Sequence, residues 1–244
     1  SGIFPSVGGT RRPGTTVLIE DVAFPLKELP EATADLQELL VTNEYHDACI
    51  YGHALEGNFH FIISQSFDSP EQVARYEKLM DEVKTLVVDK YDGSLKAEHG
   101  TGRNMAPFVK YEWGERAYGF MKAVKELFDP KGLLNPGVIF NEDPHCHLKH
   151  FKPMPLTNAH VDKCIECGFC EVNCLTCGFS LSSRQRIVIQ REISRLKKLS
   201  DTESSERLKT LQKQYKYLGN ATCAGDGLCS MSCPMGINVG DLTH

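Results

Sequence analysis

Apolar and polar positions along the first part of the chain predict strands and helices in succession. Four short apolar runs rich in β-branched residues predict strands, and they lie at residues 16–24, 47–51, 59–66 and 94–98. Apolar residues recur at helical spacing in three longer segments, which cover residues 29–45, 69–87 and 113–128. The first six of these elements follow the order β-α-β-β-α-β. This order is that of a split ferredoxin-like fold, with a four-stranded antiparallel sheet and helices on one face.

The pattern changes after residue 140. Residues 141–160 contain three prolines and little periodicity, which predicts a linker. From residue 161 onward, cysteines are separated by two amphipathic segments at residues 181–199 and 202–217. We therefore predict an α+β fold class: a ferredoxin-like domain at 1–140, a linker at 141–160, and a small all-α domain organised around metal at 161–244.

Composition and charge exclude several partners. The net charge is −5, with 27 basic and 32 acidic residues, so neither nucleic acid nor an anionic membrane is an expected partner. No apolar run approaches the roughly 18 residues that a transmembrane segment needs. The basic residues between Arg184 and Lys198 are predicted to form a solvated helix face, and Arg11 and Arg12 a polar loop. Because Ser1 rather than methionine begins the chain, we expect it to be part of a longer protein.

The cysteines are clustered. The chain has ten, and eight of them lie between Cys164 and Cys233. Thiols at intervals of three and four residues are typical of metal ligands rather than of disulfides. This clustered placement favours a reducing compartment. We predict a cytoplasmic protein, or one bound peripherally at the inner membrane.

The spacing of the cysteines predicts two iron–sulfur clusters. Residues 164–174 show the C-x2-C-x2-C-x3-C run of bacterial ferredoxins, whose fourth cysteine ligates the other cluster. Residues 223–233 repeat this spacing, with Asp226 in place of the second cysteine. Structural zinc is the alternative, but zinc sites usually show separated pairs of cysteines.

The predicted ligand pairing is crossed. Cluster one is expected to use Cys164, Cys167, Cys170 and Cys233. Cluster two is expected to use Cys174, Cys223 and Cys229. The remaining iron of cluster two could be held by Asp226, by Cys177 or by solvent, or it could be absent, which would leave a 3Fe–4S in place of a 4Fe–4S cluster. Carboxylate is a harder ligand than thiolate, so cluster two should be the more easily damaged.

A second group of candidate ligands lies in the first domain. His53 and His60 flank a glycine turn between two predicted strands, and Glu98 and His99 follow the last predicted strand. Two histidines and a carboxylate can form an open divalent-metal site with positions free for substrate. Either segment alone is more often structural, but both stand at glycine-rich strand ends.

The segments GHALEGNFH at 52–60 and EHGTG at 98–102 resemble the C-terminal domain of FAD-linked oxidases of the vanillyl-alcohol-oxidase superfamily. D-lactate dehydrogenase, glycolate oxidase and D-2-hydroxyglutarate dehydrogenase are members. The stretches at 20–25 and 129–137 resemble that domain's first strand and its closing loop. The resemblance is strongest to large bacterial proteins that add an iron–sulfur domain.

The resemblance implies roles for particular residues. His53, His60 and Glu98 would bind a divalent metal, zinc or manganese, and His99 would act as the general base. Asn135 would lie at the flavin of FAD, most of which an upstream domain would bind. Where hydroxyglutarate enzymes carry polar substrate-binding residues, this chain has Ile19 and Ile62, so the particular hydroxy acid stays open.

The resemblance also implies a reaction. A D-2-hydroxy acid would be oxidised to the 2-oxo acid, and electrons would pass from FAD through the clusters to a quinone, a cytochrome or a protein acceptor. The alternative is a non-catalytic iron–sulfur electron-transfer subunit, in which the first domain serves only for docking.

Overall fold

The computed structural model describes residues 3–243, which form two compact units. The first, here called the sheet unit, comprises Leu18–Ile63 and Phe67–Lys152. The second, called the cysteine unit, comprises residues 3–17, 64–66 and 153–243 among those described. Residues 3–17 therefore group with the cysteine-rich part of the chain, although we predicted them within the domain 1–140. No helix in the described range combines the length and apolar character that crossing a membrane requires.

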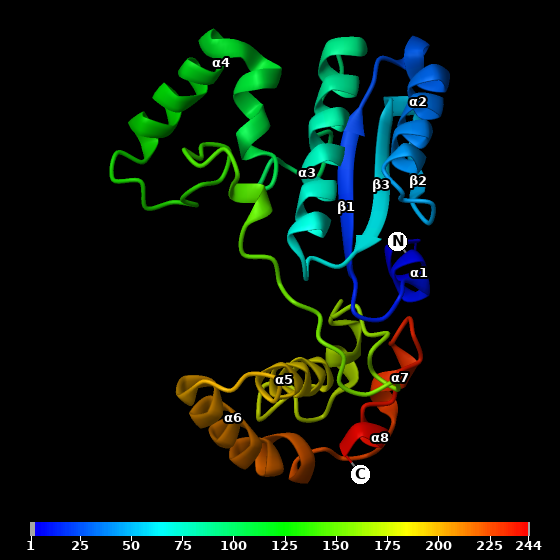
Figure 1. Ribbon diagram of the computed structural model, residues 1–244, viewed down its shortest axis with the longest axis vertical. Coiled ribbons are helices and arrows are strands. Elements are labelled where there is room, and N and C mark those ends of the chain that lie inside the picture. The colour runs from blue at the N-terminus through cyan, green and yellow to red at the C-terminus, as the bar shows by residue number, and fades with distance from the viewer. Residues whose placement is uncertain (1–2, 244) are drawn as a thin grey trace. The chain divides into compact units, whose positions relative to one another are not determined.

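Strands β1 (Thr16–Ala23), β2 (Cys49–His53) and β3 (Asn58–Gln65) form a sheet in the order β1-β3-β2. Helices α2 (Leu29–Thr42) and α3 (Pro70–Lys84) run alongside this sheet (Figure 1). Along β3, Phe61 and Ile63 belong to the main apolar core, which includes Leu36 and Leu40 of α2. Since side chains alternate along a strand, residues 58, 60 and 62 point to the opposite face. The α+β class is confirmed.

The fourth strand predicted at 94–98 does not form. The structure shows only one antiparallel bridge there, between Ala23 and Ser94. The backbone N–H groups of the next residues, 97–99, donate instead to the carboxylate of Asp21, at 3.0, 2.7 and 2.7 Å. A side chain thus replaces the neighbouring strand as acceptor, and the sheet in the described residues has three strands.

Helix α4 (Ala106–Phe128) is longer than predicted and is interrupted at Gly114, where φ is 73° and ψ is 168°. A left-handed φ of this kind suits glycine and breaks the helical path. After the break, apolar side chains that recur at helical spacing are exposed, with Val124 42% and Phe128 79% exposed.

Part of the predicted linker packs onto the sheet unit. Residues 146–148 form a 3-10 turn with a buried His147, and Leu148 and Phe151 contact the main core. The Phe151 ring stacks on Phe67 at 3.8 Å between centroids. Leu148 and Phe151 therefore anchor the segment 141–152 to the main core. The lack of periodicity in this segment did not indicate such packing.

The cysteine unit consists mainly of short helices joined by cysteine-bearing loops. Its helices are α1 (Ile3–Thr10), a 3-10 turn at Phe169–Asn173, α5 (Ser183–Leu196), α6 (Thr202–Tyr215) with a π turn at Lys216–Ala221, α7 (Leu228–Met231) and α8 (Gly240–Thr243). Helix α5 begins with a capping box between Ser182 and Gln185. The buried apolar cluster is small and comprises Val161, Ile187, Cys229, Ile237 and Val239.

Candidate functional site

The hairpin of β2 and β3 brings His53 and His60 together. In its antiparallel register, Tyr51 pairs with His60 and His53 pairs with Asn58, so these four side chains share one face. The hairpin depends on glycine, because a Cβ on Gly52 would lie 2.2 Å from the carbonyl oxygen of Asn58. The two imidazole rings are 5.7 Å apart between centroids.

Glu98 joins both histidines. Its Oε1 lies 3.0 Å from Nε2 of His60 and 3.4 Å from Nε2 of His53. These three ligand atoms all lie within 4.8 Å of one another. Nitrogen, nitrogen and oxygen donors converging in this way fit one divalent cation such as zinc or manganese. His60 is buried, whereas His53 and Glu98 are exposed, so the group is open to solvent on one side.

His99 lies beside this group. Its ring stacks on that of His60 at 4.5 Å with an interplanar angle of 5°, and its Nε2 is 3.6 Å from Oε1 of Glu98. The imidazole is partly exposed. It is therefore available to exchange a proton with a molecule bound next to His53, His60 and Glu98.

Asp21 contacts the ring nitrogen of His60 that faces away from Glu98, and the sequence analysis did not identify this role. Its carboxylate is fully buried on β1, and Oδ1 lies 3.3 Å from Nδ1 of His60. Burial opposes its charge, but the backbone N–H groups of residues 97–99 and the nearby His99 hold the pKa of Asp21 below its ordinary value. An acidic residue inside an apolar strand was the signal that could have identified it.

In a second set of three residues, Asp21, His60 and His99, the possible ligand atoms also lie within 4.8 Å of one another. Three backbone N–H groups already occupy Oδ2 of Asp21, and its other oxygen faces His60. A metal-bound histidine typically donates a hydrogen bond from its second ring N–H to a carboxylate. Asp21 therefore fits the orienting position, and Nε2 of His60 is left for the cation beside Glu98.

Asn135 lies in the turn after α4. Its φ is 44°, its side chain is exposed, and its carbonyl oxygen accepts from the N–H of Val138 at 3.2 Å. The turn is organised by Asp129, whose side chain accepts from the N–H groups of Leu133 and Leu134. The pKa of Asp129 is lowered to about 2 by Lys125 and by these two N–H groups.

A partly buried ion pair supports the loop that carries Glu98. Nζ of Lys96 lies 2.8 Å from Oε2 of Glu20, and the side chain of Glu20 is only 4% exposed. Glu20 also accepts from Asn104 at 2.5 Å. Because these contacts join β1 to the segments on either side of Glu98, they limit the positions that Glu98 can take.

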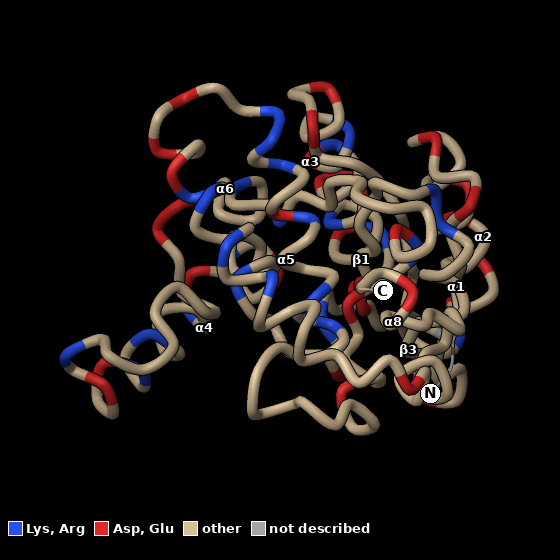
Figure 2. The backbone as a smooth tube through the Cα atoms, turned by 90° about the horizontal axis from the view of Figure 1, so that it is seen from below, with Lys and Arg blue, Asp and Glu red and all other residues tan. Residues whose placement is uncertain are grey.

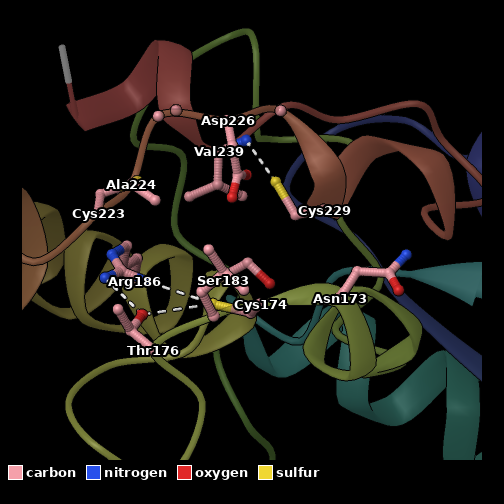
Figure 3. Close-up of a pocket in the computed structure, with 14 residues that line it drawn as sticks. Asn173, Cys174, Thr176, Ser183, Arg186, Cys223, Ala224, Asp226, Cys229 and Val239 are labelled. Atoms are coloured by element: carbon pink, nitrogen blue, oxygen red, sulfur yellow. Dashed lines mark hydrogen bonds between the residues drawn. The ribbon is translucent and has the colours of Figure 1, made fainter.

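The cysteine unit contains a small, partly open cavity. Its walls include Cys174, Cys223 and Cys229 together with Asp226, and Cys177 is not among the lining residues. Figure 3 shows Cys229 and Asp226 across the cavity from Cys174. The last cysteine of the first run thus faces cysteines of the second run, as the crossed pairing requires.

Three of the four cysteines expected at cluster one lie around the small apolar cluster. Cys164, Cys170 and Cys233 all pack against it, and Cys167 is exposed. Burial raises the pKa of the Cys164 and Cys170 thiols. Although burial also opposes ionisation of Cys174, hydrogen bonds from Thr176 and Ser183 and the charge of Arg186 hold its pKa below the ordinary value.

The thiols of the described residues do not converge as the four ligands of a single ion do. Within the described residues, no three cysteine sulfurs lie within 4.8 Å of one another, and both groups that do meet this distance contain histidines of the sheet unit. The four thiolates of a structural zinc site bind one ion. Those of a cubane bind different irons and stay farther apart.

Two arginines of α5 were predicted on a solvated face and are buried instead. Basic residues do follow α5 and α6 (Figure 2), but Arg186 is 1% exposed and Arg191 is 4% exposed. Arg191 pairs with Glu166 at 2.6 Å and donates to the carbonyls of Asp162 and Cys164. Arg11, predicted in a polar loop, is also buried and donates to the same carbonyls. Carbonyls left free by irregular loops explain why these cations enter the interior.

The fold and its two groups of ligands define a protein with an open histidine–carboxylate site and a separate cysteine-rich domain. Comparison with known families agrees. Residues 2–139 match the family "FAD linked oxidases, C-terminal domain", and residues 160–237 match "4Fe-4S dicluster domain". The chain belongs to the FAD-linked oxidase family and carries a 4Fe–4S dicluster domain.

Curated relatives align with the first part of the chain. Glycolate oxidase subunit GlcD of Bacillus subtilis is 27% identical over 128 residues, which are 52% of this chain and 27% of that protein. The probable mitochondrial D-lactate dehydrogenase of Danio rerio is 30% identical over 128 residues, 52% of this chain and 25% of that protein. D-2-hydroxyglutarate dehydrogenase of Stutzerimonas stutzeri is 33% identical over 124 residues, 49% and 26% respectively. The chain thus spans about a quarter of the length of these relatives.

Proposed function

We propose that this chain is the substrate-binding and electron-transfer part of a flavin-dependent dehydrogenase that oxidises a D-2-hydroxy acid to the 2-oxo acid. The observation that carries the proposal is the convergence of His53, His60 and Glu98, with His99 beside them. A domain used only for docking would not need a buried histidine oriented by a buried carboxylate. The geometry therefore favours an enzyme over a non-catalytic electron-transfer subunit.

In this proposal Nε2 of His53, Nε2 of His60 and a carboxylate oxygen of Glu98 hold zinc or manganese and leave positions open for substrate. When bound, the cation polarises the hydroxyl and carboxylate of the substrate, FAD accepts the hydride, and the clusters carry electrons one at a time. His99 takes the hydroxyl proton, a role that typically contributes about 10²–10⁴-fold. Asp21 keeps His60 in the tautomer that directs Nε2 toward the cation.

The cysteine unit would hold two iron–sulfur clusters. Cluster one uses Cys164, Cys167, Cys170 and Cys233, and cluster two uses Cys174, Cys223 and Cys229. The cavity walls support Asp226 rather than Cys177 as the residue facing the fourth iron of cluster two. The electron acceptor would be a quinone, a cytochrome or a protein, and Asn135 would lie at the flavin.

The deciding variant is His99→Asn in the intact protein. We expect turnover to fall about 10²–10⁴-fold, because the general base is lost, while the iron and divalent-metal content and the visible absorbance of the clusters stay unchanged. His46→Asn, at an exposed histidine on the loop before β2, is the matched control and should keep full turnover. Unchanged turnover in His99→Asn would sink the catalytic assignment.

The substrate is identified by a separate experiment. Reduction of an artificial dye by the intact protein is followed with D-lactate, D-2-hydroxyglutarate and glycolate, three acids suggested by the names of the relatives. Saturable reduction by one of them, abolished in His99→Asn, would support the proposal. Absence of reduction by any 2-hydroxy acid would favour the electron-transfer subunit.

A further inference from the structure

Arg186 is the largest side chain that is fully buried in the described chain. It lies in the first turn of α5, after the capping box, and its guanidinium points toward the cavity of the cysteine unit (Figure 3). Its Nε donates to the carbonyl of Gly219 at 2.7 Å, and one terminal nitrogen donates to the hydroxyls of Thr176 and Thr222, each at 3.1 Å. The other terminal nitrogen donates to Sγ of Cys174 at 3.7 Å.

Within the described residues, this guanidinium bonds to a carbonyl, two hydroxyls and a sulfur, and to no carboxylate. A buried charge is costly unless an opposite charge compensates it. The cavity that Arg186 lines is also lined by Cys174, Cys223, Cys229 and Asp226. A cluster bound to these ligands would carry net negative charge and would be the missing counter-charge.

We propose that Arg186 is a positioning residue that raises the reduction potential of cluster two by donating to the Cys174 thiolate and by placing a buried positive charge beside it. The inference rests on the proposed function, because it requires a cluster on Cys174, Cys223 and Cys229. Reduction adds one electron, and hence one negative charge, to the cluster. A nearby cation and an N–H···S bond both stabilise the reduced form, and hydrogen bonds to sulfur, net charge and solvent exposure set such potentials.

Cluster one has a different surrounding. Arg191, five residues further along the same helix, is neutralised by Glu166 at 2.6 Å and otherwise donates to backbone carbonyls and to the thioether of Met154. Arg11 likewise donates to carbonyl oxygens. These arginines hold the loop of cluster one, and among residues 3–243 neither of them donates to a cysteine sulfur. Arg186 should therefore affect cluster two selectively.

The test is a reductive titration of the intact protein with dithionite, followed by electron paramagnetic resonance so that each cluster gives its own midpoint potential. Three variants are compared: Arg186→Lys, Arg186→Gln and Arg195→Gln. Arg186→Lys keeps the charge but cannot reach all partners of the planar guanidinium. Arg195, on the same helix, bonds to Glu192 through its side chain and serves as the control.

We expect Arg186→Gln to lower the equilibrium constant for reducing cluster two by at least about tenfold, which is about 59 mV for one electron. Arg186→Lys should restore part of this loss. Cluster one in all variants, and both clusters in Arg195→Gln, should keep their potentials. If Arg186→Gln fails to fold, a lowered potential for cluster two alone in Arg186→Lys carries the same support.

Two results would overturn the inference. One is unchanged potentials for both clusters in both Arg186 variants. The other is equal loss of both clusters in these variants, which would make Arg186 a general folding residue. A wild-type protein that shows only one cluster would instead refute the proposed second cluster itself, so the two failures are distinguishable.

Discussion

In the sheet unit the three atoms proposed to hold a cation already lie within 4.8 Å of one another, whereas in the described part of the cysteine unit no three sulfurs do. Strand register and a buried carboxylate place His53 and His60, and a core of seventeen buried residues supports them. The cysteines lie on irregular loops around a core of five buried residues. The fold therefore organises the histidine–glutamate site, whereas binding of the clusters must help to fold the cysteine unit.

The largest expected effect is that of removing iron. Metal binding to a site with little structure of its own contributes directly to folding. We expect anaerobic chelation to unfold the cysteine unit, with loss of helical circular dichroism and rapid proteolysis within residues 153–243. The core of the sheet unit should stay resistant. Equal protection of both parts after complete iron removal, checked by mass spectrometry of the fragments, would contradict the comparison.

Breaking the partly buried pair under the Glu98 loop should have the next largest effect. Lys96→Met leaves the buried carboxylate of Glu20, 4% exposed, without its cation, and removing one partner of a buried polar group costs about 1–3 kcal/mol. Denaturant unfolding can be followed by the fluorescence of Trp113, the single tryptophan. Lys78→Met, which removes an exposed pair with Glu82, should cost less than about 1 kcal/mol. Similar losses in both variants would argue against a rigid support.

Asp21→Asn tests whether the orienting carboxylate prepares the cation site. Loss of such a partner typically weakens metal affinity about 10–100-fold. Titration of the intact protein with Mn²⁺, followed by paramagnetic resonance, measures the affinity directly. Asp47→Asn, at an exposed position before β2, is the control. An unaltered affinity in Asp21→Asn would place Asp21 outside the site.

The smallest effect is a pH dependence in the turn that carries Asn135. The pKa of Asp129 is about 2 in the folded chain because of Lys125 and the N–H groups of Leu134 and Leu133, against about 3.9 when unfolded. A lowered folded pKa means that its stabilisation is complete above about pH 4 and is lost as the pH falls toward 2. Amide exchange at 133 and 134, corrected for intrinsic rates, should be faster in Asp129→Asn at pH 7. A difference from wild type that persists undiminished at pH 2 would exclude this role.

The sequence by itself determined much of the order of elements. Apolar runs rich in β-branched residues predicted β1, β2 and β3 within a few residues, and helical spacing of apolar residues predicted α2 and α3 equally closely. The cysteine spacing predicted a dicluster domain, since three thiolates at such intervals can wrap one cubane. The glycine turn between His53 and His60 indicated two strands joined at that turn, with both histidines at the same end of the sheet.

Only the tertiary structure decided which polar residues are buried and what they contact. Residues 94–98 alternate between polar and apolar positions like a strand. In the structure, however, the backbone N–H groups of residues 97–99 donate to the carboxylate of Asp21 on β1. The run between Arg184 and Lys198 looks uniformly solvated in sequence, yet Arg186 and Arg191 enter the interior. The burial of a charge depends on partners that are distant along the chain, here Cys174, Gly219 and Glu166, and local periodicity contains no record of them.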